Sequence, residues 1–68
     1  MTSHEEEFIR AEVVRIEQLI RSNKADLVAM RIRGIPQDAP EMASTSNRLE
    51  DLQAEQNRLK SVLESARH

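Results

Sequence analysis

The chain has 68 residues and a formal net charge of −2, and about a third of its residues are charged, a composition typical of long helices and coiled coils. Its length allows one small domain, and the absence of cysteine excludes both a disulfide framework and a cysteine-ligated zinc site. No apolar stretch is long enough for a membrane span or the core of a signal peptide. We therefore expect a cytoplasmic protein that folds as one domain over residues 1–68.

A first helix is predicted over about residues 4–33. Ser3-His4-Glu5-Glu6 fits a capping box, in which Ser3 would cap the helix and Glu6 would reach back to it. Beyond this start, apolar residues recur at alternating steps of four and three, the heptad spacing of a coiled coil. Asn23 is the polar member of this series, whose apolar members are Ile9, Val13, Ile16, Ile20, Leu27 and Met30.

A turn is predicted over about residues 34–38, close to the middle of the chain. Gly34 directly follows Arg33, the expected last residue of the first helix, at the position where a helix commonly ends in a left-handed residue, and Pro36 prevents the helix from continuing. We expect Gly34 to adopt that left-handed conformation. The turn divides the chain into two arms of nearly equal length.

A second helix is predicted over about residues 39–67. Asp38-Ala39-Pro40-Glu41 fits another capping box, with the proline tolerated in the first turn. The residues at 43–47 are weak helix formers, so the start could fray or be delayed to Ser46. The heptad series continues through Met42, Thr45, Leu49, Leu52, Gln56, Leu59, Leu63 and Ala66.

The two heptad series fit each other when the chain folds back on itself. With a turn centred on Pro36, residues whose numbers sum to 72 share a layer, and each a position of one arm then meets a d position of the other. The sequence therefore predicts an all-α, coiled-coil-like antiparallel two-helix hairpin. Its expected core consists of Ile9, Val13, Ile16, Ile20, Leu27, Met30, Leu49, Leu52, Leu59 and Leu63.

A single hairpin with this core buries too little apolar surface to offset the ordering of its chain. Self-association is the ordinary remedy, and we expect a homodimer, with two hairpins forming a four-helix bundle. Apolar residues outside the core positions mark a face for the second copy or for another protein, unless they are simply scattered on the surface. They are Phe8, Val14, Leu19, Val28, Ile32 and Val62.

No residue pattern in the chain indicates catalysis, a metal site or a cofactor. His4 and His68 offer two terminal ligands without a third, and the Glu5–Glu7 run is explained by the positive end of the helix dipole. We expect a protein that is not an enzyme and binds no cofactor. The basic residues that could contact a nucleic-acid backbone, Arg21, Lys24, Arg31 and Arg33, have no aromatic partners for stacking.

Two classes of function follow. The first is a non-enzymatic oligomeric hairpin that serves as a scaffold, an adaptor or a small protein-binding or co-chaperone module. The alternative is a nucleic-acid-binding four-helix bundle that uses the basic flank of the first helix. In length and expected architecture the chain resembles small helical-hairpin regulators of plasmid copy number and co-chaperones of type III secretion, and it shares no residue motif with either.

Overall fold

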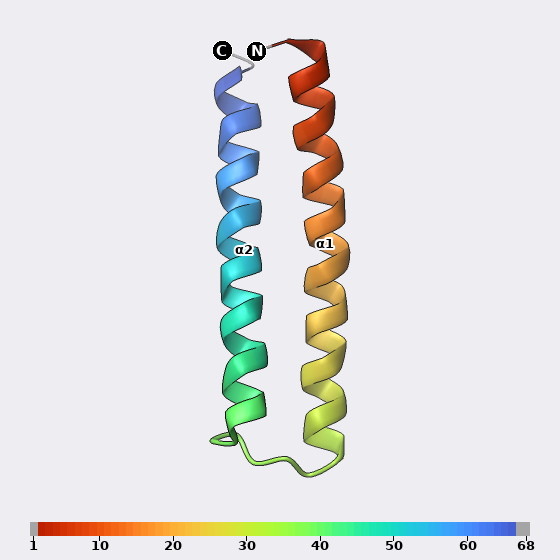
Figure 1. Cartoon of the computed structure of the whole chain (residues 1–68), viewed down its shortest axis with the longest axis vertical. Helices are drawn as coiled ribbons and strands as arrows, with labels where there is room; N and C mark the ends of the chain where they lie inside the picture. Colours follow the sequence, from red (N-terminus) through yellow and green to blue (C-terminus); the bar gives the residue numbers. More distant parts are fainter. Residues whose placement is uncertain (1, 67–68) are drawn as a thin grey trace.

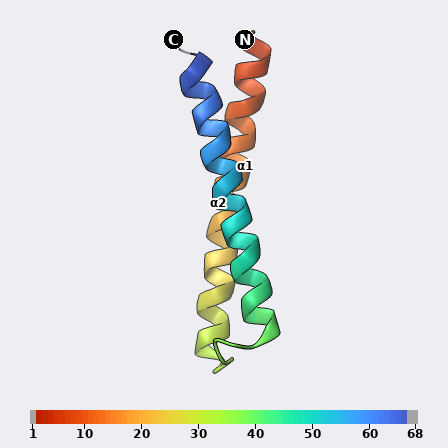
Figure 2. The same cartoon turned by 90° about the vertical axis from the view of Figure 1, so that its left-hand side faces the viewer.

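Two helices of similar length make up the protein. The computed structural model describes residues 2–66, in which helix α1 spans Ser3–Ile32 and helix α2 spans Pro40–Ala66. The helices run antiparallel and are joined at one end by residues 33–39 (Figure 1). The molecule is a rod of 48 × 15 × 13 Å in which the helices cross at a shallow angle (Figure 2). The predicted all-α antiparallel hairpin is confirmed, and neither helix of the described chain is long and apolar enough to cross a membrane.

Helix α1 begins one residue earlier than its sequence predicts. Thr2 is the N-cap, and its hydroxyl oxygen accepts a hydrogen bond from the backbone N–H of Glu5 at 3.2 Å. The prediction that Ser3 caps the helix is therefore wrong, since Ser3 is already helical. Thr2 and Glu5 fit the same capping pattern shifted by one residue, so local sequence alone does not separate the two starts.

Helix α1 ends in a Schellman motif. The N–H of Gly34 donates to the carbonyl of Arg31, and the N–H of Ile35 donates to the carbonyl of Met30, each at 3.0 Å. Gly34 has a φ of 81°, which confirms the predicted left-handed conformation. These two bonds satisfy carbonyls that the end of the helix would otherwise leave without partners.

Helix α2 begins at Pro40 and continues without a break through the stretch of weak helix formers. Asp38 makes no hydrogen bond within residues 2–66, so the predicted second capping box is wrong. The carbonyl of Ala39 accepts the first helical bond, from the N–H of Ala43 at 3.1 Å. Within α2 the hydroxyl of Thr45 donates to the carbonyl of Glu41, one turn earlier, at 2.9 Å.

The core lies along the line between the helices and is thin. Ile16, with 2% of its surface exposed, packs with the buried Ile20 and Leu59 at its centre. The partly buried side chains that pack against this cluster are Ile9, Val13, Leu49 and Leu52. Of the other expected core residues, Leu27, Met30 and Leu63 are only half-buried. Met42, a heptad position outside the expected core, is buried near the connection between the helices. Most expected core positions thus keep part of their surface in water.

Candidate protein-binding surface

One polar residue sits in the core between the helices. Asn23 is 6% exposed, and its side-chain amide donates a long hydrogen bond of 3.5 Å to the backbone carbonyl of Thr45. Its expected layer partner was Leu49, one helical turn farther along α2. Asn23 bonds to Thr45, one turn before Leu49, because the carbonyl oxygens of a helix point toward its C-terminal end. The oxygen of Thr45 therefore lies toward the layer of Leu49. No buried polar side-chain atom in the described chain lacks a hydrogen-bond partner.

The large apolar residues left in water lie on α1. Among residues 2–66, five large apolar side chains are exposed, and α2 carries none of them. Ile32 is the most exposed, at 81%, followed by Phe8 at 68%. The others are Val14, Val28 and Leu19. Exposed apolar side chains gathered on one helix of a pair, outside the core, are a feature typical of interaction surfaces.

The outer face of α1 carries these residues in two groups. The N-end cluster consists of the exposed residues Phe8, Ala11 and Val14, and the loop-end cluster of the exposed residues Ala25, Val28 and Ile32. Both follow steps of three and four residues, which places each cluster on one side of the helix, away from the core. Exposed polar side chains separate them: Arg15, Gln18, Arg21 and Ser22.

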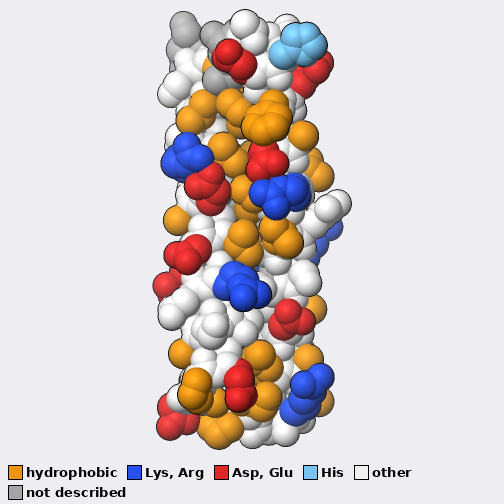
Figure 3. Space-filling model, in the orientation of Figure 1, with side chains coloured by type: hydrophobic (Ala, Val, Ile, Leu, Met, Phe, Trp, Pro, Cys, Tyr) orange, Lys and Arg blue, Asp and Glu red, His pale blue; other side chains and the backbone are white. Residues whose placement is uncertain are grey.

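Leu19 and Val62 lie on the flanks of the core rather than on the outer face of α1. Leu19 is exposed and Val62 is half-buried, so a neighbour on that side of the hairpin would find apolar contact on both helices. Two shallow hollows open near the free ends of the helices. One is lined by His4, Glu5, Phe8 and Ile9, and the other by Arg58, Ser61, Val62, Ser65 and Ala66. Figure 3 shows apolar side chains interrupted by charged ones along this view of the rod.

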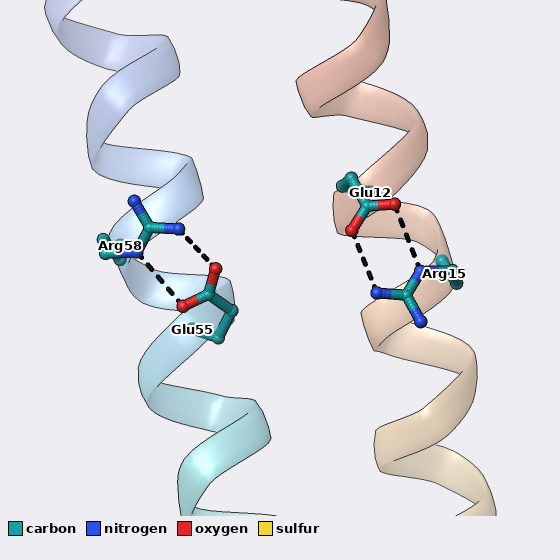
Figure 4. Close-up of polar contacts among 4 residues, drawn as sticks. All are labelled: Glu12, Arg15, Glu55 and Arg58. Carbon is teal, nitrogen blue, oxygen red and sulfur yellow. Dashed lines mark hydrogen bonds and ion pairs between the residues drawn. The ribbon is translucent and has the colours of Figure 1, made fainter.

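Two ion pairs lie at a similar height on the two helices, one within α1 and one within α2 (Figure 4). Arg15 binds Glu12 through two hydrogen bonds of 3.2 and 2.9 Å, and Arg58 binds Glu55 in the same way on α2. The hydrogen bond from each arginine lowers the pKa of its glutamate, while the charge of Glu55 acts in the opposite direction on the pKa of Glu12. Both pairs have a spacing of three residues, at which side chains on one helix are neighbours.

Other charges pair both within α1 and across the hairpin. Glu6 accepts a hydrogen bond from Arg10 at 2.8 Å, one helical turn away. Glu17, which has the same spacing from Arg21, instead lies 3.9 Å from the ammonium of Lys60 on α2. Arg21 is thus left without an ion pair in the described chain, as are the other basic residues suggested for nucleic acid, Lys24, Arg31 and Arg33. All four are exposed and lie on or directly after α1.

The described residues hold no group of three or more histidine, cysteine or acidic side chains that could bind a metal ion. His4 is exposed at the first turn of α1, and His68, its suggested partner, lies outside residues 2–66. Comparison of the chain with protein-family models, with curated proteins and with solved structures gives no match. The functional proposal therefore rests on the surface of α1.

Proposed function

We propose that the hairpin is a non-enzymatic protein-binding module that works as a homodimer, in the role of a scaffold or adaptor. The observation that carries the proposal is the concentration of exposed large apolar side chains on α1, while α2 turns a polar outer surface to water. A helix that only needed to cover its partner in the hairpin would require one apolar side, and α1 has a second.

The thin core supports self-association in particular. Four apolar residues are buried, and most other core positions keep part of their surface in water, so a single hairpin leaves stabilising contact unused. A second copy is present wherever the protein is made, and in a two-fold interface every contact between the copies occurs twice. Folding and association are then coupled, and helix content depends on protein concentration.

The test compares the chain with two charge-bearing double variants by sedimentation equilibrium and far-UV circular dichroism across a dilution series. Val14→Lys with Val28→Lys places charges in both apolar clusters and should produce monomers with reduced helix content on dilution. Ala43→Lys with Asn57→Lys is the matched control, because these exposed residues of α2 have the same separation along the helix. The control should remain a dimer.

A strongly helical monomer of the unmodified chain at low concentration would overturn the homodimer. A dimer that survives both valine substitutions would show that the copies associate through a surface other than the apolar clusters of α1. The same samples address nucleic acid as the partner. The chain has no tryptophan or tyrosine, so strong absorbance in the nucleobase band after purification at low salt would come from bound nucleic acid. Its removal by salt would favour the basic residues of α1 as the binding surface.

A further inference from the structure

The N-end and loop-end clusters of α1 can pair between two copies of the chain. The N-end cluster of one copy then covers the loop-end cluster of the other. They are centred about 17 residues apart, or roughly 26 Å along the helix, with their midpoint near residues 19–20. We propose that the second copy packs antiparallel along the outer face of α1, about a two-fold axis that runs between the two α1 helices, perpendicular to them and level with this midpoint. This proposal rests on the homodimer proposed above and assigns its interface and orientation.

Side-chain sizes match in this arrangement. Residues whose numbers sum to 39 or 40 face each other, so Val14 of one copy lies against Ala25 of the other, and Val28 lies against Ala11. Each valine therefore meets an alanine, the alternation of large and small that lets two helices approach closely. Phe8 packs on Ile32, which brings together the two most exposed large apolar side chains of residues 2–66.

The residues between the clusters also fit. At the two-fold axis Gln18 of one copy faces Arg21 and Ser22 of the other, so polar groups occupy the centre of the interface. The interface that results has an apolar patch at each end and a polar middle that remains open to water. Two-fold symmetry makes both patches identical, and each consists of the N-end cluster of one copy and the loop-end cluster of the other.

Charge selects the antiparallel orientation over the parallel one. In the antiparallel pair Glu7 lies beside Arg31 of the second copy, and Arg21, which has no ion pair within its own hairpin, lies beside Glu17. A parallel pair in register would also join apolar clusters, but it would set Arg21 against Arg21 and Glu7 against Glu7. Exposed ion pairs add little affinity, yet like charges in contact penalise the wrong orientation.

Cross-linking through single cysteines tests the orientation directly, because the native chain contains none. Ala11→Cys and Val28→Cys are prepared as separate variants and treated with a short thiol-specific cross-linker, singly and as an equimolar mixture after reassociation. In the antiparallel dimer residue 11 lies next to residue 28 of the other copy, whereas the two residues 11 are about 26 Å apart. Only the mixture should yield a cross-linked dimer.

Val14→Cys with Ala25→Cys forms a second pair with the same expected behaviour, so that the result does not depend on one substitution. Ala43→Cys with Asn57→Cys, both on the exposed side of α2, should give no cross-link in any combination. Sedimentation of each variant measures whether a dimer forms, and so tests the homodimer separately from its antiparallel interface through α1. Dimers in which like residues cross-link, or in which the α2 cysteines cross-link, overturn the antiparallel α1 interface and leave the homodimer standing. Monomers overturn the homodimer.

Discussion

The side-chain amide of Asn23 in α1 donates a hydrogen bond to the backbone carbonyl of Thr45 in α2. The bond joins the two helices at a layer where an apolar residue would pack more favourably, and at 3.5 Å it is at the long end of the hydrogen-bond range. A buried asparagine at a heptad position typically fixes how helices align and how many associate, at some cost in stability. Asn23 has the position and the contact for this role.

Replacing Asn23 with leucine should raise stability by about 1 kcal/mol, equivalent to roughly 4–8 °C in Tm for a domain of this size. The substitution leaves no unpaired acceptor behind, because the carbonyl of Thr45 lies inside a continuous helix and keeps its helical partner. The distribution of oligomers should broaden at the same time. Thermal unfolding followed by circular dichroism, together with sedimentation velocity, measures both effects. A lower Tm with an unchanged oligomer would show instead that the hydrogen bond is a net source of stability.

Gly34→Val should destabilise the hairpin by about 1–2 kcal/mol, since a β-branched residue is strained in the left-handed region. The cost comes from the backbone alone, because a Cβ atom at this position would meet nothing within 4 Å. Gly34→Asn is the matched control and should lose less, as asparagine tolerates this conformation better. Urea unfolding at one fixed protein concentration compares the two. Equal losses for valine and asparagine would contradict a backbone origin.

Ile16→Ala should cost about 2–5 kcal/mol, because Ile16 is the most deeply buried side chain of the core cluster and its removal leaves a cavity between the helices. Leu63→Ala, at a half-buried position of the same heptad series, is the comparison and should cost less. Urea unfolding at matched concentration gives both values. If the Leu63 variant loses more, the free end of the hairpin is covered in the assembled protein to a greater extent than the centre.

Stability should fall as the pH is lowered through the acidic range. The pKa values of Glu12 and Glu55 are lowered in the folded protein by their arginine partners, so the contribution of each pair is present above the ordinary pKa of glutamate, 4.5, and is lost as pH falls through the lowered value. Both carboxyls are exposed, so the effect is small. Glu12→Gln with Glu55→Gln should flatten the dependence of Tm on pH below about 5. An unchanged slope would assign the acid sensitivity to other carboxyls.

Heptad spacing predicted the two helices and their antiparallel arrangement because it reports directly which side of a helix is covered. The glycine at the end of α1 was predictable for a similar reason, since few residues other than glycine adopt a positive φ readily. The exact first residues of the two helices were not predictable from the sequence. Thr2 and Ser3 are adjacent residues that can each cap a helix, and Asp38 sits where a cap is common yet makes no hydrogen bond within residues 2–66.

Long side chains were the least predictable part of the candidate surface. Glu17 has an arginine one turn away on its own helix and yet lies near Lys60 of α2, because flexible side chains choose among partners of similar energy. The exposed apolar side chains of α1 are different. Their positions follow from helix geometry once the core side is known, and the structure places Phe8, Val14, Val28 and Ile32 in water.

The uneven distribution of apolar surface sets unequal limits on how the two helices can change in sequence. The outer positions of α2 are exposed in the hairpin, so most polar replacements there should leave the fold intact. In the proposed dimer the outer positions of α1 do not have this freedom. A scan that replaces each exposed residue with lysine should therefore reduce dimer formation at the outer positions of α1 and leave it unchanged at those of α2. In diverging copies of this chain, the residues on the outer face of α1 would then change little, and those on the outer face of α2 would change freely.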